Sequence, residues 1–316
     1  MENFFNNERI LKSLWRWKIH IIIALFAAIV VSAIISSPIF LKPKYKSVAR
    51  AYPINTELYS KESESEQMLE DLRSNDIKFK MIDAFQLDKV YGIGRDIPHY
   101  KSYIINEYDE NVSFKKTEFE SVEIKVLDQN PQRASDMVDS LIVFFHKLKK
   151  QQRNYKFMEI AVIAERDLKI KNAEIDSLSK VLTQMTEEYG LLDYDTQVEA
   201  ATVGLMDAAA NRGDTKPAKE IINSLKTKGL EFNRLHKQLQ SAEHTADSLR
   251  LRYDYGVSQG TKDITYTIVV ERPFPADKKS YPVRWLIVFL STVATLLASI
   301  VTVVTIDYFR ERSSAK

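Results

Sequence analysis

Residues 272–306 read RPFPADKKSYPVRWLIVFLSTVATLLASIVTVVTI and join a proline-rich segment to an uncharged one. The last 22 of these residues, 285–306, contain no charged side chain. At about 1.5 Å of rise per residue they form a helix of roughly 33 Å, longer than the roughly 30 Å hydrocarbon core of a bilayer. We therefore predict transmembrane helix 2 over 285–306. A buried core helix of a soluble protein is the alternative interpretation.

A second apolar stretch near the N-terminus disfavours that alternative. Residues 19–35 carry only His20 and Ser32 as polar members, and the apolar character continues toward Phe40. We predict transmembrane helix 1 over 19–41. A cleaved signal peptide is the rival interpretation, but no small-residue cleavage pattern of the Ala-x-Ala kind follows the apolar run.

Two spans leave residues 1–18 and 307–316 as tails on the same side of the membrane. The positive-inside rule assigns such basic tails to the cytoplasm. Cations also flank the spans on the other side, but long loops translocate largely regardless of charge, so the short tails carry more weight. The middle segment is therefore predicted to lie outside the cytoplasm. The tail cations are Arg9, Lys12, Arg16, Lys18, Arg310, Arg312 and Lys316.

The composition argues against several classes of function. A formal net charge of +2 does not indicate a polyanion partner, and no basic fold signature points to nucleic acid. The absence of cysteine excludes disulfides and thiol chemistry. His236 and His244 lie about 80° apart around a helix, which does not match the spacing of a helical metal site. We predict no enzyme, with no catalytic, cofactor-binding or metal-binding residues.

The pattern of residues 42–130 predicts a domain of mixed α and β structure, which we call the base. Residues 261–284 are predicted to form a strand that returns to the base, followed by a proline-rich segment, which we call the collar. The strands are expected where apolar and polar residues alternate. Asp76 is expected to cap one of the helices. The predicted strands are 45–54, 111–116, 119–127 and 263–270, and the predicted helices are 68–72, 76–85 and 98–108.

Residues 131–260 predict a long antiparallel helical hairpin. Asn130 and Pro131 begin a helix, and no further proline or glycine occurs before Gly190. Apolar residues then recur at steps of 3 and 4 on both sides of a breaker region at 190–216, as in a coiled-coil seam. Gly256 and Gly260 are expected to end the second helix. The predicted fold class is an α+β membrane protein, in which two transmembrane helices flank an extracytoplasmic α/β base that carries this hairpin.

Two short motifs stand at the joints of this architecture: Pro273-Phe-Pro275 with Ser280-Tyr-Pro282-Val-Arg284 in the collar, and Asp128-Gln-Asn-Pro131-Gln-Arg-Ala134 at the start of the long helix. They resemble motifs of the Wzz-type chain length determinants, or polysaccharide co-polymerases. The collar is similar to that family's P-x2-P-x4-S-P-K pattern, and the turn from the base into the long helix resembles its Asp-x-x-Pro-x-x-Ala pattern. The first two collar prolines are one residue apart instead of two, Tyr281 separates the serine from the last proline, an arginine replaces the lysine, and the usual glycines of the second span are absent. Asp139 stands where the family commonly has Asn. The collar residues are Pro273, Pro275, Ser280, Pro282 and Arg284, and the turn residues are Asp128, Pro131 and Ala134.

The resemblance implies a non-enzymatic homo-oligomer of the bacterial inner membrane, with most of the chain in the periplasm. Such a protein regulates the chain length of O-antigen, capsule or exopolysaccharide made by a separate membrane-embedded polymerase. Lipid-linked polysaccharide is a second candidate partner. One alternative is an export adaptor whose tail, 307–316, engages a separately encoded tyrosine kinase. A two-span sensor is a third interpretation, which the short tails disfavour.

Overall fold

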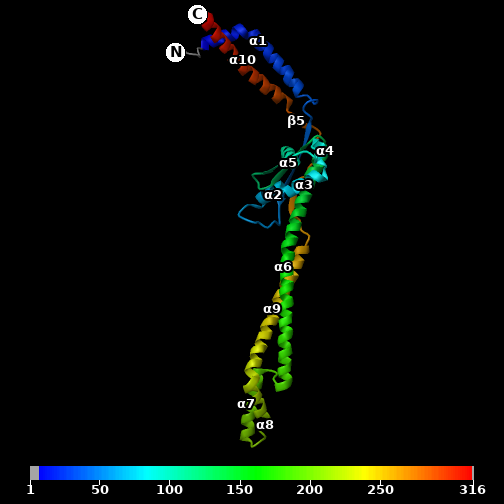
Figure 1. Ribbon diagram of the computed structural model, residues 1–316, viewed down its shortest axis with the longest axis vertical. Coiled ribbons are helices and arrows are strands. Elements are labelled where there is room, and N and C mark those ends of the chain that lie inside the picture. Colours follow the sequence, from blue (N-terminus) through cyan, green and yellow to red (C-terminus); the bar gives the residue numbers. More distant parts are fainter. Residues whose placement is uncertain (1–6, 315–316) are drawn as a thin grey trace. The chain divides into compact units, whose positions relative to one another are not determined.

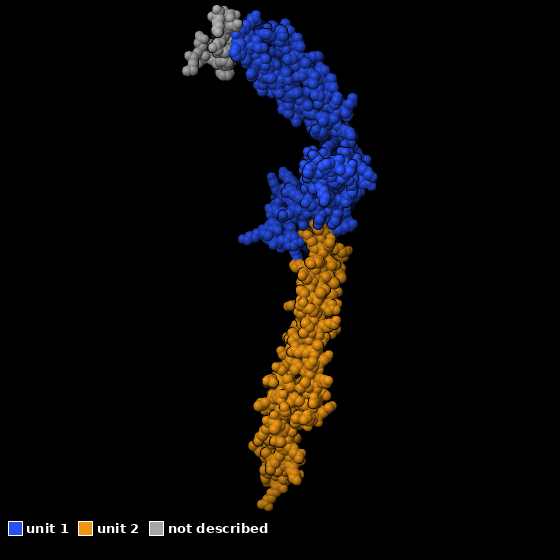
Figure 2. Space-filling model, in the orientation of Figure 1, with its two compact units in different colours: residues 1–147, 265–316 blue, residues 148–264 orange. Residues whose placement is uncertain are grey.

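The computed structural model describes residues 7–314. Residues 1–6 and the tail cation Lys316 lie outside the described residues, as do the side chains of Arg9 and Arg312. The chain forms two compact units, 1–147 with 265–316, and 148–264 (Figure 2). The elements are α1 Asn7–Ile35, β1 Lys44–Pro53, α2 Glu64–Arg73, α3 Asn75–Ala84, α4 Leu87–Tyr91, α5 Tyr100–Asn111, β2 Val112–Lys116, β3 Val122–Asp128, α6 Pro131–Tyr189, α7 Tyr194–Ala210, α8 Lys216–Ser224, the π-helix η1 Leu225–Gly229, α9 Leu230–Thr261, β4 Thr267–Glu271, β5 Lys279–Tyr281 and α10 Arg284–Ser314 (Figure 1).

The base is an antiparallel sheet with β1 at its centre. The strand order is β2-β3-β1-β4, and β5 pairs with the beginning of β1 on the side where β4 pairs with its end. One face is apolar and fully buried, with Ala49 and Ala51 from β1 beside Val122 and Ile124 from β3. α2 and α5 pack against β2 and β3. This alternation of buried and open faces is what the period-2 pattern of these strands predicts.

α1 and α10 are both long and apolar enough to cross a membrane, over Leu11–Ile35 and Arg284–Asp307. They pack against each other, and the side chains buried along the pair include Ser32 of α1 and Val303 of α10. Ser32 is a small residue, and small residues allow two helix backbones to approach closely. Trp17 Nε1 donates a hydrogen bond to Asp307 Oδ1 at 3.1 Å. The two helices are therefore antiparallel.

The unit 148–264 is an antiparallel helical hairpin, in which α9 lies beside the C-terminal part of α6 (Figure 1). Arg153 Nε donates to the Gln259 carbonyl at 3.1 Å near one end of the pair. Near the other end, Met185 and Phe232 belong to one buried apolar cluster. Together with the sheet and the two apolar helices, this hairpin confirms the predicted α+β fold class and the 59-residue helix α6.

Several predicted boundaries are wrong, each for a local reason. The first apolar helix ends at Ile35 and does not continue toward Phe40, because Pro38 lacks an N–H and restricts the residue before it. Ser74, not Asp76, caps α3, since its side chain accepts from the Ile77 N–H.

The predicted breaker region, 190–216, contains a helix that the sequence interpretation missed. It is α7, and Asp193 caps it by accepting from the Thr196 N–H at 2.7 Å. Gly256 lies inside α9 and does not end it, whereas Gly260 is one residue from its end at Thr261. A Cβ on Gly256 would lie 2.9 Å from the Phe157 carbonyl oxygen. These glycines therefore mark a close approach of α9 to α6.

Candidate functional site

The turn from the base into α6 is a closed network of charge and backbone contacts. Asn130 Oδ1 accepts from the N–H groups of Gln132 and Arg133 at 2.9 and 3.2 Å, which caps α6. Asp128 accepts from the Asn130 N–H at 2.7 Å and pairs with the Arg133 guanidinium, also at 2.7 Å. Pro131 is the first residue of α6, and Ala134 is buried. The motif therefore positions the start of the long helix on the end of β3.

The collar is joined to the sheet through β5, a strand that the sequence interpretation missed. Ser280 lies within β5, Pro282 is buried next to it after a cis peptide bond, and Arg284 begins α10. Earlier in the collar, Phe274 lies between Pro273 and Pro275, and its carbonyl accepts from the Ser47 hydroxyl at 3.1 Å. The collar is thus held against β1, the strand that follows α1.

β1 brings the two motifs together. Tyr45 is opposite Asp128 on the β3 side and opposite Lys279 on the β5 side. Neighbouring strands lie about 4.8 Å apart. The base-to-helix turn and the collar therefore flank the same residue of β1, although they are far apart in sequence.

A buried polar cluster supports the same end of the sheet. Lys44 Nζ donates to Asn111 Oδ1 at 2.6 Å, and the Asn111 amide donates to the Glu107 carbonyl at 2.7 Å. Burial raises the pKa of Tyr91, and the nearby carboxylates of Asp128 and Glu107 raise it further. A phenol with a raised pKa stays neutral at physiological pH, so Tyr91 adds no charge to this cluster.

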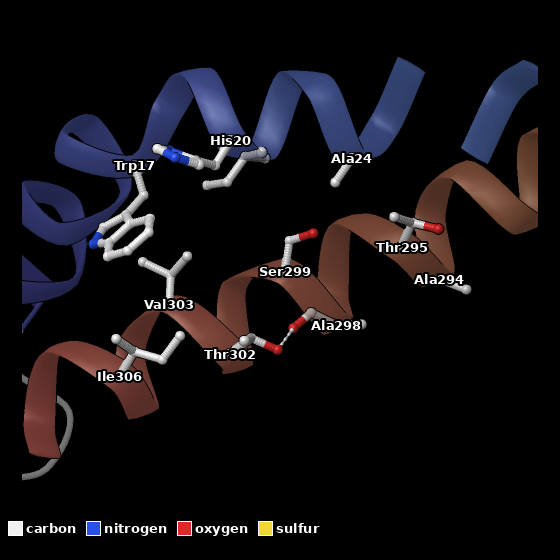
Figure 3. Close-up of a pocket in the computed structure, with 11 residues that line it drawn as sticks. Trp17, His20, Ala24, Ala294, Thr295, Ala298, Ser299, Thr302, Val303 and Ile306 are labelled. Carbon is white, nitrogen blue, oxygen red and sulfur yellow. Dashed lines mark hydrogen bonds between the residues drawn. The ribbon is translucent and has the colours of Figure 1, made fainter. Parts of the chain in front are cut away.

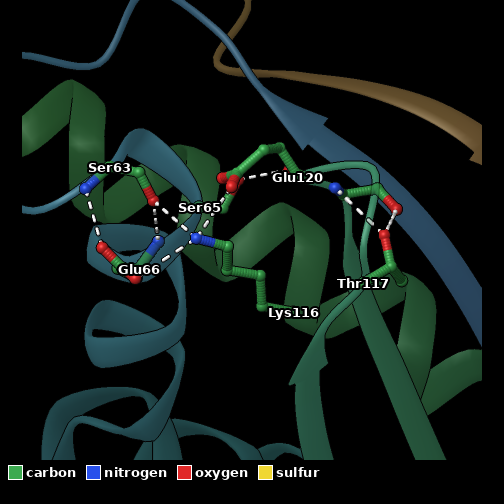
Figure 4. Close-up of polar contacts among 7 residues, drawn as sticks. Ser63, Ser65, Glu66, Lys116, Thr117 and Glu120 are labelled. Atoms are coloured by element: carbon green, nitrogen blue, oxygen red, sulfur yellow. Dashed lines mark hydrogen bonds and ion pairs between the residues drawn. The ribbon is translucent and has the colours of Figure 1, made fainter.

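The hairpin between β2 and β3 is braced by a second polar network (Figure 4). Lys116 Nζ contacts Ser63 Oγ at 3.4 Å, Glu66 Oε1 at 3.2 Å and Glu120 Oε1 at 2.9 Å. The Ser65 hydroxyl donates to the Glu120 carbonyl. Because Ser63 and Glu66 also form the capping box of α2, the turn is fixed to the start of that helix.

This braced turn presents an aromatic side chain that the sequence interpretation overlooked. Phe119, expected to begin a strand, lies in the turn with 78% of its surface exposed. Beside it, the uncovered face of the sheet forms a groove of about 440 Å³, whose lining includes Tyr52, Arg50, Glu123 and Val270. We call this surface the open sheet face. Its mixture of aromatic, apolar and charged groups suits a protein partner.

No group of three or more His, Asp or Glu residues that could hold a metal ion occurs among the residues whose side chains the structure describes. No family model matches the sequence, and no curated protein matches it. One similar solved structure is described as a full-length bacterial polysaccharide co-polymerase, with 13% identity and a TM-score of 0.46 over 95% of this chain and 97% of that chain. Similarity at this level identifies neither a family nor a function for this chain.

Proposed function

We propose that this chain is a non-enzymatic, two-pass scaffold of the bacterial inner membrane that regulates the length of a cell-surface polysaccharide. The polysaccharide, which is O-antigen, capsule or exopolysaccharide, is made by a separate membrane-embedded polymerase. The observation that carries the proposal is the meeting of the two resembling motifs on β1, at Tyr45. One motif leads into the long helix and the other into the second apolar helix. The same strand, β1, therefore contacts the segments that lead into both helices.

The prolines of the collar fit this role. Proline has no N–H to donate and a fixed φ, and it restricts the residue before it to extended geometry. The collar therefore neither extends α10 toward the base nor adds a long strand to the sheet. It holds the sheet at a short, fixed distance from the start of α10, with β5 as the attachment.

A strain that lacks the gene tests the proposal. We expect this strain still to make the polysaccharide, but with an altered length distribution on a silver-stained gel. The wild-type gene should restore the original distribution. A chain with Pro273, Pro275 and Pro282 all changed to Ala should fail to restore the distribution. The matched control is Pro217→Ala, a proline in the first turn of α8, which should restore it. An unchanged distribution in the deletion strain, or complete loss of the polysaccharide, would contradict the proposal.

The scaffold is proposed to act as a homo-oligomer in which the open sheet face packs against a second copy. The face carries both signs of charge, with Arg50 paired to Glu123 at 3.2 Å, and an exposed Phe119, an aromatic residue of the kind enriched at interfaces. We expect Phe119→Asp to lower the particle mass measured by light scattering in nanodiscs. Tyr155→Asp is the control, since Tyr155 of α6 is similarly exposed, at 73%. Equal masses for both variants and wild type would rule out this surface.

A further inference from the structure

The two apolar helices enclose a groove at the end of the pair that carries both tails (Figure 3). Its volume is about 550 Å³, and its walls include Ala24 of α1 and Ala294 and Ala298 of α10. The α10 side runs from Ala294 to Ile306, which is about 18 Å of helix. One leaflet contributes about half of a roughly 30 Å hydrocarbon core. The groove therefore has the length of an acyl chain in one leaflet.

A polar side chain, that of His20, lines this groove. His20 lies within the apolar stretch of α1, is exposed, and has its ring centroid 4.9 Å from that of Trp17. No hydrogen bond to the His20 ring is found among the residues with described side chains. A polar side chain in hydrocarbon is costly unless it has a partner, and such residues mark functional positions. His20 is the second residue of the apolar run 19–35, at the edge of the hydrocarbon, where a lipid headgroup supplies an acceptor.

The charges at this end of the pair match an anionic headgroup. Arg16 lies four residues before His20 and therefore on the same side of α1. Lys12, Arg16 and Arg310 are exposed at the same end. α10 carries two acids at this end: Asp307 is buried and bonded to Trp17, and Glu311 lies among the residues whose side chains are not described. Basic clusters beside a span attract anionic lipids, with about 1 kcal/mol per cation near the surface.

A partner helix fits the pair less well than a lipid. A second groove, of about 620 Å³, lies toward the opposite end of the pair and includes Ala33 and Trp285. Ala24 and Ala33 are nine residues apart, which places them about 180° apart around α1. A straight helix that crosses the bilayer beside the pair could not fill both grooves, whereas separate lipids from each leaflet could.

We propose that the groove at the tail end of α1 and α10 binds an anionic phospholipid. One acyl chain lies along Ala24, Ala294 and Ala298, and the phosphate accepts from His20 and from Arg16, which lies one turn before it on the same side of α1. This site is independent of the role in polysaccharide length, because neither the collar nor the base takes part in it.

Fluorescence quenching of Trp17 tests the proposal in the full-length chain. With Trp15 and Trp285 changed to Phe, Trp17 is the remaining tryptophan, because the chain contains three. The protein is placed in phosphatidylcholine nanodiscs that contain brominated phosphatidylglycerol or, in equal amount, brominated phosphatidylcholine. We expect stronger quenching by the phosphatidylglycerol, and loss of that preference in His20→Leu and in Ala298→Phe.

The matched control is Ala33→Phe, which fills the second groove and should keep the preference. Circular dichroism establishes that each variant is folded, and His20→Leu tests the site even where Ala298→Phe does not fold. Equal quenching by the two lipids would overturn the proposal. A preference for phosphatidylglycerol that survives both His20→Leu and Ala298→Phe would also overturn it. The proposal would fail as well if neither lipid quenched Trp17, because a protein segment would then cover the groove.

Discussion

At the scale of residues, the base-to-helix turn shows why its three motif positions have these identities. Asp128 is a buried carboxylate whose charge is balanced by Arg133 and by the Asn130 N–H. Pro131 occupies the first helical position, where a missing N–H costs nothing. Ala134 is buried, where a larger side chain would not fit. Arg133 occupies an unspecified position of the resembling pattern, yet it completes the charge balance.

Asp139 provides a test at this scale, because it replaces the Asn expected from the resemblance. Partial burial raises the pKa of Asp139 above its ordinary 3.8, and repulsion from Asp136 raises it further, against an opposing effect of Arg272. Its charged form is therefore disfavoured in the folded chain, and this cost is present above the raised pKa and vanishes as pH falls below 3.8.

We expect Asp139→Asn to increase the free energy of unfolding at pH 7, by no more than about 0.5 kcal/mol because solvent screens an exposed group. Thermal melts of wild type and variant over a pH series measure the difference. The gain should shrink as the pH approaches 3.8. A variant that is less stable than wild type at pH 7, or a gain that does not depend on pH, would refute this account of Asp139.

At the scale of elements, the packing of α9 on α6 depends on glycine. A Cβ on Gly256 would meet the Phe157 carbonyl oxygen at 2.9 Å and the Ala161 Cβ at 3.0 Å. Both neighbours belong to a helix, so they move only with its backbone. Gly204 of α7 has no neighbour within 4 Å of its would-be Cβ among the described residues.

We predict opposite effects for the same substitution at these two sites. Gly256→Ala should lower the free energy of unfolding by about 1–3 kcal/mol, as overpacking does. Gly204→Ala should raise it by up to about 1 kcal/mol, since alanine is the better helix former. Hydrogen exchange of peptides from α6, α7 and α9 measures both. If Gly256→Ala left the exchange of α6 and α9 unchanged, close packing at this position would not be required.

Elements whose sequence signals lie within the element itself could be predicted, and elements that depend on pairing with distant residues could not. The helix over 131–189 was predictable because its cap, its first proline and its lack of breakers are all local. α7 was missed because its single glycine and flanking turn residues resemble a loop. β5 was missed because three residues carry no periodicity, and its pairing joins Lys279 to Tyr45 across most of the chain.

The same distinction between local patterns and distant pairing applies to the residues of the candidate site. The collar and turn residues were recognisable as motifs, but their meeting on β1 depends on sheet pairing, which a motif does not encode. Phe119 was overlooked because the brace that holds its turn comes from Ser65 and Lys116, and neither residue belongs to a recognisable pattern. The groove at Trp17 and His20 requires the antiparallel pairing of α1 and α10.

At the scale of the whole molecule, the chain enters and leaves its base on adjacent strands. β1 follows the first apolar helix and β5 precedes the second, and the two strands pair. If both helices cross the bilayer, the base and the hairpin occupy one side and both tails occupy the other. The proposed function depends on this arrangement, because a polysaccharide at the cell surface is reached only from outside the cytoplasm.

Labelling of single cysteines tests this arrangement most directly, because the chain has no cysteine of its own. Asp207→Cys probes α7, and Arg310→Cys probes the tail that follows the second apolar helix; both positions are exposed. Spheroplasts are treated with a membrane-impermeant maleimide before and after lysis. We predict that Asp207→Cys reacts in intact spheroplasts and that Arg310→Cys reacts only after lysis. Reaction of Arg310→Cys in intact spheroplasts, or of Asp207→Cys only after lysis, would contradict the account.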